Sequence, residues 1–461
     1  MKKLLLLLSF LLFQNASFSA NVQIGTNGEF LLNGEPFFPI MQWMQNHKNI
    51  RTQASYGINV FSVPGNTISS KGWCDSASAN QVYACVTYKP EIVDSIKDHP
   101  GFFGWFFGDE PDLQGHEITP DSIRAQYNAL KLSDPNHPTF LTITSRFYSE
   151  TSLPAWMNKS DAFYYEYPKY TDAIGFDLYP IYGWCRPDWI YQVPDAVKEL
   201  KNKYVKTVKP IYAWIECGKT SSKWCNLPDR GSEDGPYASE IEAQVWLAII
   251  NGAKGIGYFT HSWECPDYRQ WCVSPEQIDI ITKINSTITS LTKVIYEPDA
   301  DIGLQISISG VNGNSGRIDA VVKEHNDSIY IFAANVINLT GTAEIQQVAI
   351  SIPGLTTPVM VYGENRTIEP QSDGTFLDTF TSKEPVHIYA MKSNRSANIY
   401  KKVEQNQYLN NPQQAIFHVH SKIPQNGLNY NLKGALISEN KKIWAKQPLI
   451  NIRPDNELKK E

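Results

Sequence analysis

The feature that most constrains the fold is a regular alternation of short apolar runs and helical stretches between residues 36 and 294. Seven of the runs are almost continuously apolar, as parallel strands covered on both faces are. They occupy 36–43, 58–63, 102–108, 139–144, 173–179, 211–215 and 255–260. Helical stretches occupy 120–132, 194–208, 239–252 and 275–292. Such an alternation predicts βαβ units that build one parallel sheet.

The eighth strand of this pattern is the least distinct. Residues 81–88 supply a suitable apolar run, but the segment before it, 65–80, is rich in Ser and Gly and has little helical periodicity. Either the second helix is vestigial or the sheet is irregular there. Eight such units over roughly 250 residues predict a (β/α)8 TIM barrel, which we place at 21–295.

The character of the chain changes after residue 296. Alternating apolar and polar residues are separated by turn signals such as Asn312-Gly313, Asn326-Asp327 and Asp373-Gly374. This pattern predicts an all-β sandwich over 296–393. Residues 394–461 are rich in Asn, Gln and Lys, and we assign them to a tail or a small appended element.

The first twenty residues have the pattern of a cleavable signal peptide. Lys2 and Lys3 precede an apolar run at 4–13, and small residues follow at Ser17, Ser19 and Ala20. The run is about half of the ~20 residues that a membrane span needs, and no later run is longer, so no span is expected. We therefore expect a secreted or periplasmic protein, cleaved after Ser19 or Ala20.

The formal charge of −6 becomes −8 when the two leader lysines are removed (−6 minus 2). Residues 1–390 contain no basic stripe of the kind that binds phosphates, so a nucleic-acid partner is not expected. The oligomeric state does not follow from the sequence.

Seven cysteines suit an oxidising compartment. Two pairs each bracket one loop, and three cysteines remain, so one thiol is left over if two of those pair. The pairs are Cys74 with Cys85 and Cys265 with Cys272, and the remainder are Cys185, Cys217 and Cys225. We expect loop disulfides of undetermined connectivity. Without a CxxC pair, and with the His418-x-His420 motif far from the first strand, we expect no metal and no cofactor.

Two apolar runs end in carboxylates. Asp109 and Glu110 follow the run at 102–108, and Glu216 follows the run at 211–215. The carboxyl ends of barrel strands form the active face. The two glutamates are 106 residues apart (216 minus 110), or about three βα units of roughly 35 residues, so strands four and seven face each other across the mouth. Hydrolysis of a glycosidic bond needs such a pair of carboxylates.

The chain resembles the clan A glycoside hydrolases, which are retaining (β/α)8 enzymes. The resemblance covers residues 36–294 and is carried by GDEP around Glu110, WIECG around Glu216, DAIGFDLYP and GYFTHSW. It implies that Glu110 is the acid/base and Glu216 the nucleophile. A β domain after the barrel is also common in these enzymes.

The same resemblance implies substrate contacts. Tyr179 corresponds to an aromatic residue near the end of strand six that often contacts the nucleophile. Trp263 corresponds to the tryptophan of strand eight that commonly forms the floor of the sugar subsite. Trp43 and His261 stand near the ends of strands one and eight and are further candidates, although either could belong to the core.

Asp109 departs from the pattern of the family, which usually has Asn before the acid/base. That Asn normally bonds the 2-hydroxyl of the sugar, whereas an ionised Asp can only accept a hydrogen bond. Recognition of the 2-hydroxyl is therefore expected to differ. A like charge beside Glu110 would also raise the pKa of Glu110, which suits a general acid.

Each assignment has a structural alternative. Asp109 and Glu110 could cap a helix that begins at Pro111, and Glu216 could be a salt-bridge partner at the barrel mouth. Glu166 and Asp177 are further carboxylates near the same face, ranked lower. The function that we expect is a retaining glycosidase acting on a poly- or oligosaccharide. An inactive carbohydrate-binding protein on a glycosidase-like barrel and another hydrolase on this fold stay open, as do an inverting mechanism, the sugar and the linkage.

Overall fold

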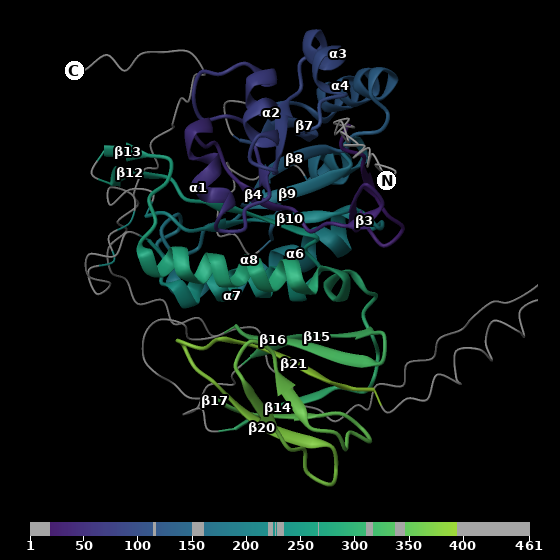
Figure 1. Ribbon diagram of the computed structural model, residues 1–461, viewed down its shortest axis with the longest axis vertical. Coiled ribbons are helices and arrows are strands. Elements are labelled where there is room, and N and C mark those ends of the chain that lie inside the picture. Colours follow the sequence, from purple (N-terminus) through teal and green to yellow (C-terminus); the bar gives the residue numbers. More distant parts are fainter. Residues whose placement is uncertain are drawn as a thin grey trace, which may run out of the picture. The chain divides into compact units, whose positions relative to one another are not determined.

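The computed structural model describes residues 19–113, 117–149, 161–219, 225, 227, 235–265, 267–309, 317–336 and 346–393. Eight parallel strands close into a barrel in which neighbours in the ring follow the chain order from β4 to β11 (Figure 1). The strands are β4 (Ile40–Gln42), β5 (Val60–Phe61), β6 (Tyr83–Thr87), β7 (Phe102–Asp109), β8 (Thr139–Thr144), β9 (Ala173–Asp177), β10 (Ile211–Glu216) and β11 (Gly255–Phe259). The predicted TIM barrel is confirmed.

Helices connect the strands on the outside of the barrel. They are α1 (Ile50–Ala54), α2 (Ser70–Ser78), α3 (Val93–Ile96), α4 (Pro120–Ser133), α5 (Asp161–Glu166), α6 (Gln192–Glu199), α7 (Ala238–Ile250) and α8 (Pro275–Tyr296). Helix α2 lies in the segment that shows little helical periodicity. It forms because the Ser69 side chain caps its first turn through the Gly72 N–H, and because Trp73 and Ala77 on one face are buried.

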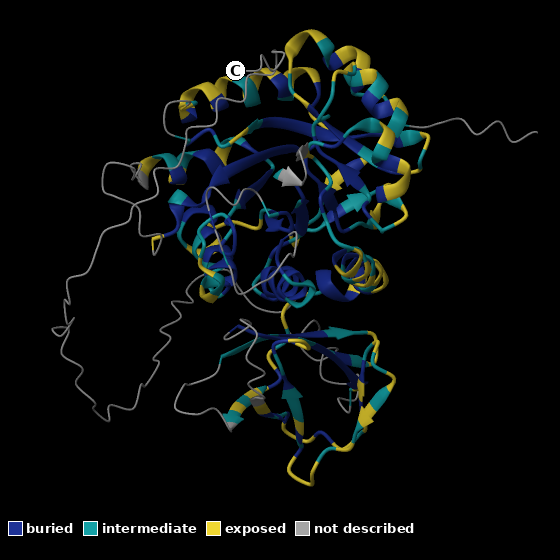
Figure 2. Cartoon of the chain, turned by 90° about the vertical axis from the view of Figure 1, so that its left-hand side faces the viewer, coloured by how far each residue is buried: buried dark blue, intermediate teal, exposed yellow. Residues whose placement is uncertain are grey.

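The barrel interior is filled by large side chains from alternate strand positions. Met41, Phe103, Phe106 and Tyr212 belong to this inner cluster, whereas Trp105 faces the helices. The strands are accordingly almost entirely buried (Figure 2). This packing explains the continuous apolar runs, since both faces of each strand exclude water.

A small antiparallel sheet precedes the barrel. It consists of β1 (Val22–Ile24), β2 (Phe30–Leu32) and β3 (Glu35–Pro36). The Phe30 ring stacks on Phe140 at 5.7 Å and packs against Phe103 at 6.0 Å. Both partners lie near the beginning of their strands, so this sheet closes the end of the barrel opposite the carboxyl ends.

Two antiparallel sheets follow α8 and confirm the predicted β domain. One contains β14 (Gln305–Ser309), β17 (Gln346–Ser351) and β20 (Thr375–Phe380). The other contains β15 (Ile318–His325), β16 (Ser328–Asn335), β21 (Val386–Lys392), β18 (Val359–Val361) and β19 (Arg366–Ile368). Ile331, Val348, Phe376 and Tyr389 form the centre of a separate core between them.

Helix α7 is buried on all sides because it has partners on two faces. Its inner face covers the barrel, and Trp246 on the other face stacks on Phe332 of β16 at 5.7 Å. Beside it, the Arg317 guanidinium donates to both carboxylate oxygens of Asp195 on α6, at 2.6 and 2.9 Å. The barrel and the β domain therefore share one packed boundary.

The cysteines correct one expectation. Cys185 and Cys225 form a disulfide, and Cys272 is also disulfide-bonded. Cys74 and Cys85, however, are free and buried. Cys74 lies within α2 and packs in the layer between helices and barrel, whereas Cys85 lies within β6 and belongs to the inner cluster. Their side chains occupy different layers, so no disulfide joins Cys74 to Cys85, and the expectation of a loop disulfide is wrong for this pair.

The described residues include no helix that is long and apolar enough to cross a membrane. Across the same residues, no cluster of His, Cys, Asp and Glu has the arrangement of a metal site. The segment 394–461, including His418 and His420, and residues 1–18 of the expected signal peptide lie outside the described residues.

Candidate active site

The last turn of β7 determines where Asp109 and Glu110 point. The pairing of β7 with β8 shifts register between Phe106 and Gly108, and Gly108 has a φ of 152°. Glu110 has a φ of 48°, a conformation that is strained for a residue with a Cβ atom. Its N–H donates to the Thr142 carbonyl at 2.9 Å. The bulge therefore turns both carboxylates into the mouth of the barrel.

Glu110 does not cap a helix. Helix α4 begins at Pro120, and the cap is the Thr119 side chain, which accepts from the Ser122 N–H. The chain after Glu110 is a turn held by the buried Asp112. Sequence reasoning missed the role of this residue, although it lies only two positions after Glu110. The Asp112 carboxylate accepts from the Thr144 N–H at 2.9 Å and hydroxyl at 2.5 Å, and from the Tyr164 hydroxyl at 3.0 Å.

A third carboxyl group joins this pair. Asp177 is the last residue of β9, and its carboxyl group interacts electrostatically with that of Glu110. Burial raises the pKa of Glu110, while the interaction with Asp177 lowers it in part. Burial and the charge of Glu110 raise the pKa of Asp177 well above its usual range. The same two causes raise the pKa of Asp109, although solvent still reaches that side chain and screens its interactions.

Glu216 ends β10 but is completely buried. Its Oε2 atom accepts from the Ile181 N–H at 2.8 Å, and its Oε1 atom accepts from the N–H groups of Tyr182 and Gly183 at 2.6 and 2.8 Å. Burial raises the pKa of Glu216 to about 7, against the opposing effect of these three donors. Glu216 is thus an anchor for the loop after β9, and in this conformation its carboxylate is not open to a substrate.

Tyr179 connects the two groups of carboxylates. Burial raises the pKa of its phenol, and negative charges from Asp177, Asp109, Glu110 and Glu216 add to the effect, in that order. Its ring stacks on Phe259 at 5.0 Å and 21°. The structure therefore brings Asp109, Glu110, Asp177 and Tyr179 together and places Glu216 beneath the loop that follows them.

Phe259 is the centre of an aromatic cluster that sequence reasoning missed, although it lies in the GYFTHSW motif. It stacks on His261 at 5.1 Å and packs near Trp263 at 6.4 Å. Trp263 and Tyr179 are partly exposed, so their rings can contact a ligand. Flat ring faces of this kind suit the apolar faces of sugars.

The other two predicted contact residues occupy core positions. His261 is 2% exposed, its Nε2 atom lies 3.3 Å from the Trp43 carbonyl oxygen, and burial lowers its pKa to about 4. Trp43 is buried between Phe106 and Trp214, at ring distances of 5.4 and 5.2 Å. Both side chains support the floor of the mouth rather than line it.

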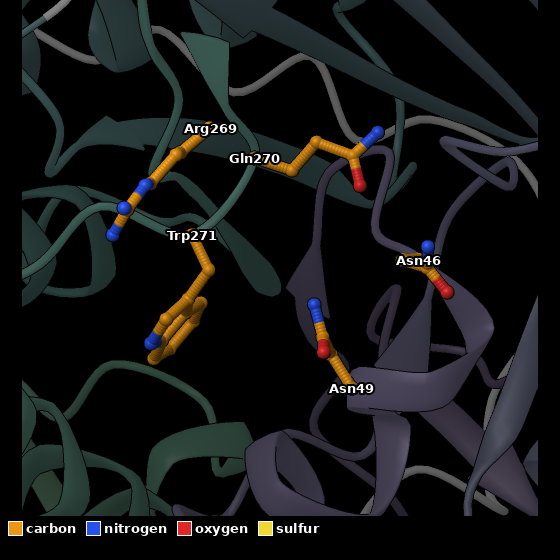
Figure 3. Close-up of a pocket in the computed structure, with 5 residues that line it drawn as sticks. All are labelled: Asn46, Asn49, Arg269, Gln270 and Trp271. Carbon is orange, nitrogen blue, oxygen red and sulfur yellow. The ribbon is translucent and has the colours of Figure 1, made fainter. Parts of the chain in front are cut away.

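A polar pocket of about 390 Å³ lies beside this face (Figure 3). Asn46 and Asn49 follow the end of β4, and they face Arg269, Gln270 and Trp271, which come after β11. The Gln270 carbonyl accepts from the Gln45 amide at 2.8 Å and from the Thr260 hydroxyl at 2.7 Å, which ties the two segments together. Both follow strand carboxyl ends, so the pocket belongs to the same end of the barrel.

No protein-family model matches the chain. Among curated proteins, the cell division protein SepF of Prochlorococcus marinus (strain MIT 9215) is 24% identical over 132 residues, which is 29% of this chain and 66% of SepF. The match therefore spans less than two thirds of that protein.

Solved structures similar to this one include three glycoside hydrolases. The GH2 β-galacturonidase of Eisenbergiella tayi is 12% identical, with a TM-score of 0.41 over 59% of this chain and 54% of that chain. The β-D-glucuronidase of Dictyoglomus thermophilum is 14% identical, with a TM-score of 0.42 over 58% and 53%. The GH30 endoxylanase of Clostridium papyrosolvens C71 is 10% identical, with a TM-score of 0.42 over 81% and 100%. This chain thus spans about half the length of the first two.

Proposed function

We propose that the protein is an exported glycoside hydrolase that cleaves O-glycosidic bonds in a poly- or oligosaccharide. The observation that carries this proposal is the group of three carboxyl side chains, Asp109, Glu110 and Asp177, at the carboxyl end of the barrel. All three act on the partly exposed Tyr179, whose ring stacks on Phe259. Phe259 in turn packs near the partly exposed Trp263. Carboxyl groups with raised pKa values at this end of a barrel suit acid–base chemistry on a sugar.

Glu110 is proposed as the general acid and base. A protonated Glu110 would give its proton to the leaving glycosidic oxygen, and the resulting carboxylate would later take a proton from the attacking water. Its raised pKa keeps a larger fraction of the side chain protonated near neutral pH. Asp109, which is solvent-exposed, is proposed to bind a sugar hydroxyl as an acceptor.

Glu216 is proposed as the nucleophile of a retaining double displacement. Attack on the anomeric carbon requires a free carboxylate oxygen, so the loop carrying Ile181, Tyr182 and Gly183 would have to release at least one of its three hydrogen bonds. Tyr179 lies on the same loop and would move with it. Substrate binding against Tyr179 is the event that we expect to open the anchor.

The burial of Glu216 favours a second candidate, a carbohydrate-binding protein without catalytic activity. A carboxylate that is 0% exposed and bonded to three backbone donors is a stable structural element as it stands. If the loop never releases Glu216, the mouth keeps Glu110 and the aromatic rings but lacks this nucleophile.

Hydrolysis of a panel of aryl glycosides and polysaccharides, with anomer analysis of the product, separates the two candidates. We expect the Glu110→Gln and Glu216→Gln variants each to lose about 10²–10⁴-fold in kcat/KM. Glu166→Gln is the matched control, because Glu166 lies on α5 in an ion pair with Lys169. Unchanged activity of Glu216→Gln would refute the nucleophile assignment. Oligosaccharide binding by a wild-type protein that hydrolyses nothing would favour the second candidate.

A further inference from the structure

The polar pocket beside the mouth contains the groups that a sugar-binding site needs. The ring of Trp271 lies on one side, and the side-chain amides of Asn46 and Asn49 lie on the other (Figure 3). An amide both donates and accepts hydrogen bonds, as a sugar hydroxyl does, and an indole ring can cover the apolar face of a sugar. The volume of about 390 Å³ lies within the range of small-molecule sites, about 300–1,000 Å³. The pocket therefore has the size and the chemistry to hold a sugar unit.

Trp271 is supported from behind by a second ring. Its indole stacks on Tyr56 at a centroid distance of 5.9 Å and an angle of 14°. Tyr56 does not line the pocket, so the part of the Trp271 ring that meets the pocket is the part that Tyr56 leaves uncovered. Trp271 is accordingly partly exposed. A ring that is fixed on one side and open on the other can stack on a ligand with little further loss of side-chain freedom.

A buried row of glutamines fixes the two sides of the pocket relative to each other. The Gln53 amide on α1 donates to Oε1 of Gln45 at 2.7 Å, and the Gln45 amide donates to the Gln270 carbonyl at 2.8 Å. Gln45 and Gln53 are 0% and 1% exposed. Asn49 directly precedes α1, and Trp271 directly follows Gln270, so this row sets the spacing between amide and ring. A site that is built in advance binds at a lower cost.

The two asparagines keep hydrogen-bonding capacity for a ligand. The side chain of Asn49 does not cap α1, and the residue is partly exposed. Oδ1 of Asn46 accepts from the Lys48 N–H at 3.0 Å, and its NH₂ group makes no hydrogen bond within the described part of the chain. Arg269 points away from both asparagines (Figure 3). No acidic residue lines the pocket among the residues that the structure describes, which suits a polar ligand without positive charge.

A short path of contacts joins the pocket to the aromatic cluster of the mouth. The Trp43 carbonyl oxygen accepts from the Gln45 amide at 2.8 Å and lies 3.3 Å from Nε2 of His261. His261 stacks on Phe259, which packs near Trp263. The pocket and the aromatic cluster are thus neighbours at the same end of the barrel.

We propose that the pocket is a saccharide subsite that binds one sugar unit of an oligosaccharide away from the bond that is cleaved. Trp271 stacks on the apolar face of that unit, and Asn46 and Asn49 hydrogen-bond its hydroxyl groups. None of the carboxyl residues of the mouth lines the pocket, so the substrate that fills both sites is a chain of several sugar units. This role in substrate recognition rests on the proposed function, whereas sugar binding in the pocket does not.

Isothermal titration calorimetry tests the subsite, with Glu110→Gln as the parent protein so that the ligand is not hydrolysed. The probes are hexasaccharides of β-1,4-linked glucose, xylose or mannose and of β-1,3-linked glucose. For the probe that the parent binds most tightly, we expect Trp271→Ala to weaken binding about tenfold or more, because the stacking surface is lost. We expect Asn49→Ala to weaken binding about three- to tenfold through the loss of hydrogen bonds.

Asn128→Ala is the matched control for Asn49→Ala, because Asn128 is exposed on α4 outside the barrel. It should leave the affinity unchanged. If Trp271→Ala does not fold, because its ring also packs on Tyr56, Asn49→Ala and its control decide alone. An affinity of the Trp271 and Asn49 variants equal to that of the parent, or no binding of any hexasaccharide, would overturn the proposal.

Hydrolysis by proteins that keep Glu110 separates the subsite from the proposed function. Trp271→Ala should lower kcat/KM for the hexasaccharide about tenfold more than for an aryl glycoside with one sugar unit, because the longer substrate fills the pocket as well as the mouth. Equal losses would mean that Trp271 only supports the fold, and would overturn the proposal. A wild-type protein that binds a hexasaccharide through Trp271 but hydrolyses nothing would refute the proposed function and support the subsite.

Discussion

At the scale of single residues, the backbone at the end of β7 decides which side chains reach the mouth. Gly108 adopts a φ of 152° that residues with a Cβ atom rarely adopt, and Glu110 follows at 48°. Apolar runs and chain spacing were sufficient to predict that Asp109 and Glu110 end a strand. They could not predict the bulge, or the three N–H groups around Glu216, because these depend on contacts between loops far apart in the chain.

The first prediction concerns Gly108. Gly108→Ala should lower the free energy of unfolding by about 1–3 kcal/mol, because it forces a Cβ atom into this conformation, and should lower kcat/KM by misplacing Glu110. Gly34→Ala is the matched control, since Gly34 has a φ of 86°, has open space around it and lies between β2 and β3. It should cost similar stability in chemical denaturation and leave activity unchanged. Equal losses of activity in the two variants would contradict the prediction.

The second prediction concerns Glu216 and pH. Its pKa is raised from 4.5 to about 7 in the folded protein, so the folded state holds this proton more tightly than the unfolded state does. The contribution of Glu216 to stability is therefore greatest below about pH 4.5 and declines as pH rises towards 7, by up to about 3 kcal/mol. Glu216→Gln should lack this decline.

Denaturant unfolding of the wild type and of Glu216→Gln across this pH range measures the difference. Glu276→Gln serves as the control, because Glu276 is exposed in the first turn of α8. If the free-energy difference between wild type and Glu216→Gln were constant with pH, Glu216 would be ionised throughout and held by its three donors alone.

At the scale of elements, the strands followed from the sequence more closely than the helices did. Strands between two layers need apolar residues at every position, which is a strong signal, and all eight lie within or beside the expected runs. Helix α2 lacks a clear apolar stripe, and its formation depends on the Ser69 cap and on burial of Trp73 against its neighbours. The Cys185–Cys225 disulfide likewise joins segments whose proximity only the fold creates.

The third prediction concerns this disulfide. It closes a loop of 40 residues, for which restriction of the unfolded chain corresponds to about 4 kcal/mol. The double variant Cys185→Ser, Cys225→Ser should lose stability up to that amount in chemical denaturation. It should also lose activity, because Cys185 follows the loop that carries Tyr179 and the donors to Glu216. A reductant should destabilise the wild type more than the double variant, and equal effects would argue against this role.

At the scale of the whole molecule, the barrel and the β domain depend on each other through α7 and α6. Helix α7 is apolar on the face that meets β16 as well as on the face that meets the barrel, so neither partner alone can bury it. The ion pair between Arg317 and Asp195 flanks this contact. The sequence predicted both domains but not their packed boundary. A helix that is buried on two sides has the same apolar sequence pattern as any other strongly apolar helix.

The fourth prediction tests this boundary. Trp246→Ala should lower the free energy of unfolding by about 3–5 kcal/mol, because it leaves a large cavity between α7 and Phe332. Leu132→Ala is the control, since Leu132 is 89% exposed on α4 and should change stability by less than about 0.5 kcal/mol. A single cooperative transition is expected in the wild type. Two separate transitions by calorimetry would show that the domains unfold independently.

The small sheet of β1, β2 and β3 closes the end of the barrel opposite the strand carboxyl ends. This position of the first strands affects where a leader could be cut. Ala20 is 4% exposed, and its carbonyl oxygen lies 3.3 Å from Nε2 of His137. Of the two cleavage positions expected from the sequence, a cut after Ala20 would discard this contact, whereas a cut after Ser19 would retain it and make Ala20 the first residue of the mature chain. If the proposed leader is removed, we therefore expect the cut between Ser19 and Ala20, and N-terminal sequencing of the purified protein would show whether Ala20 is kept.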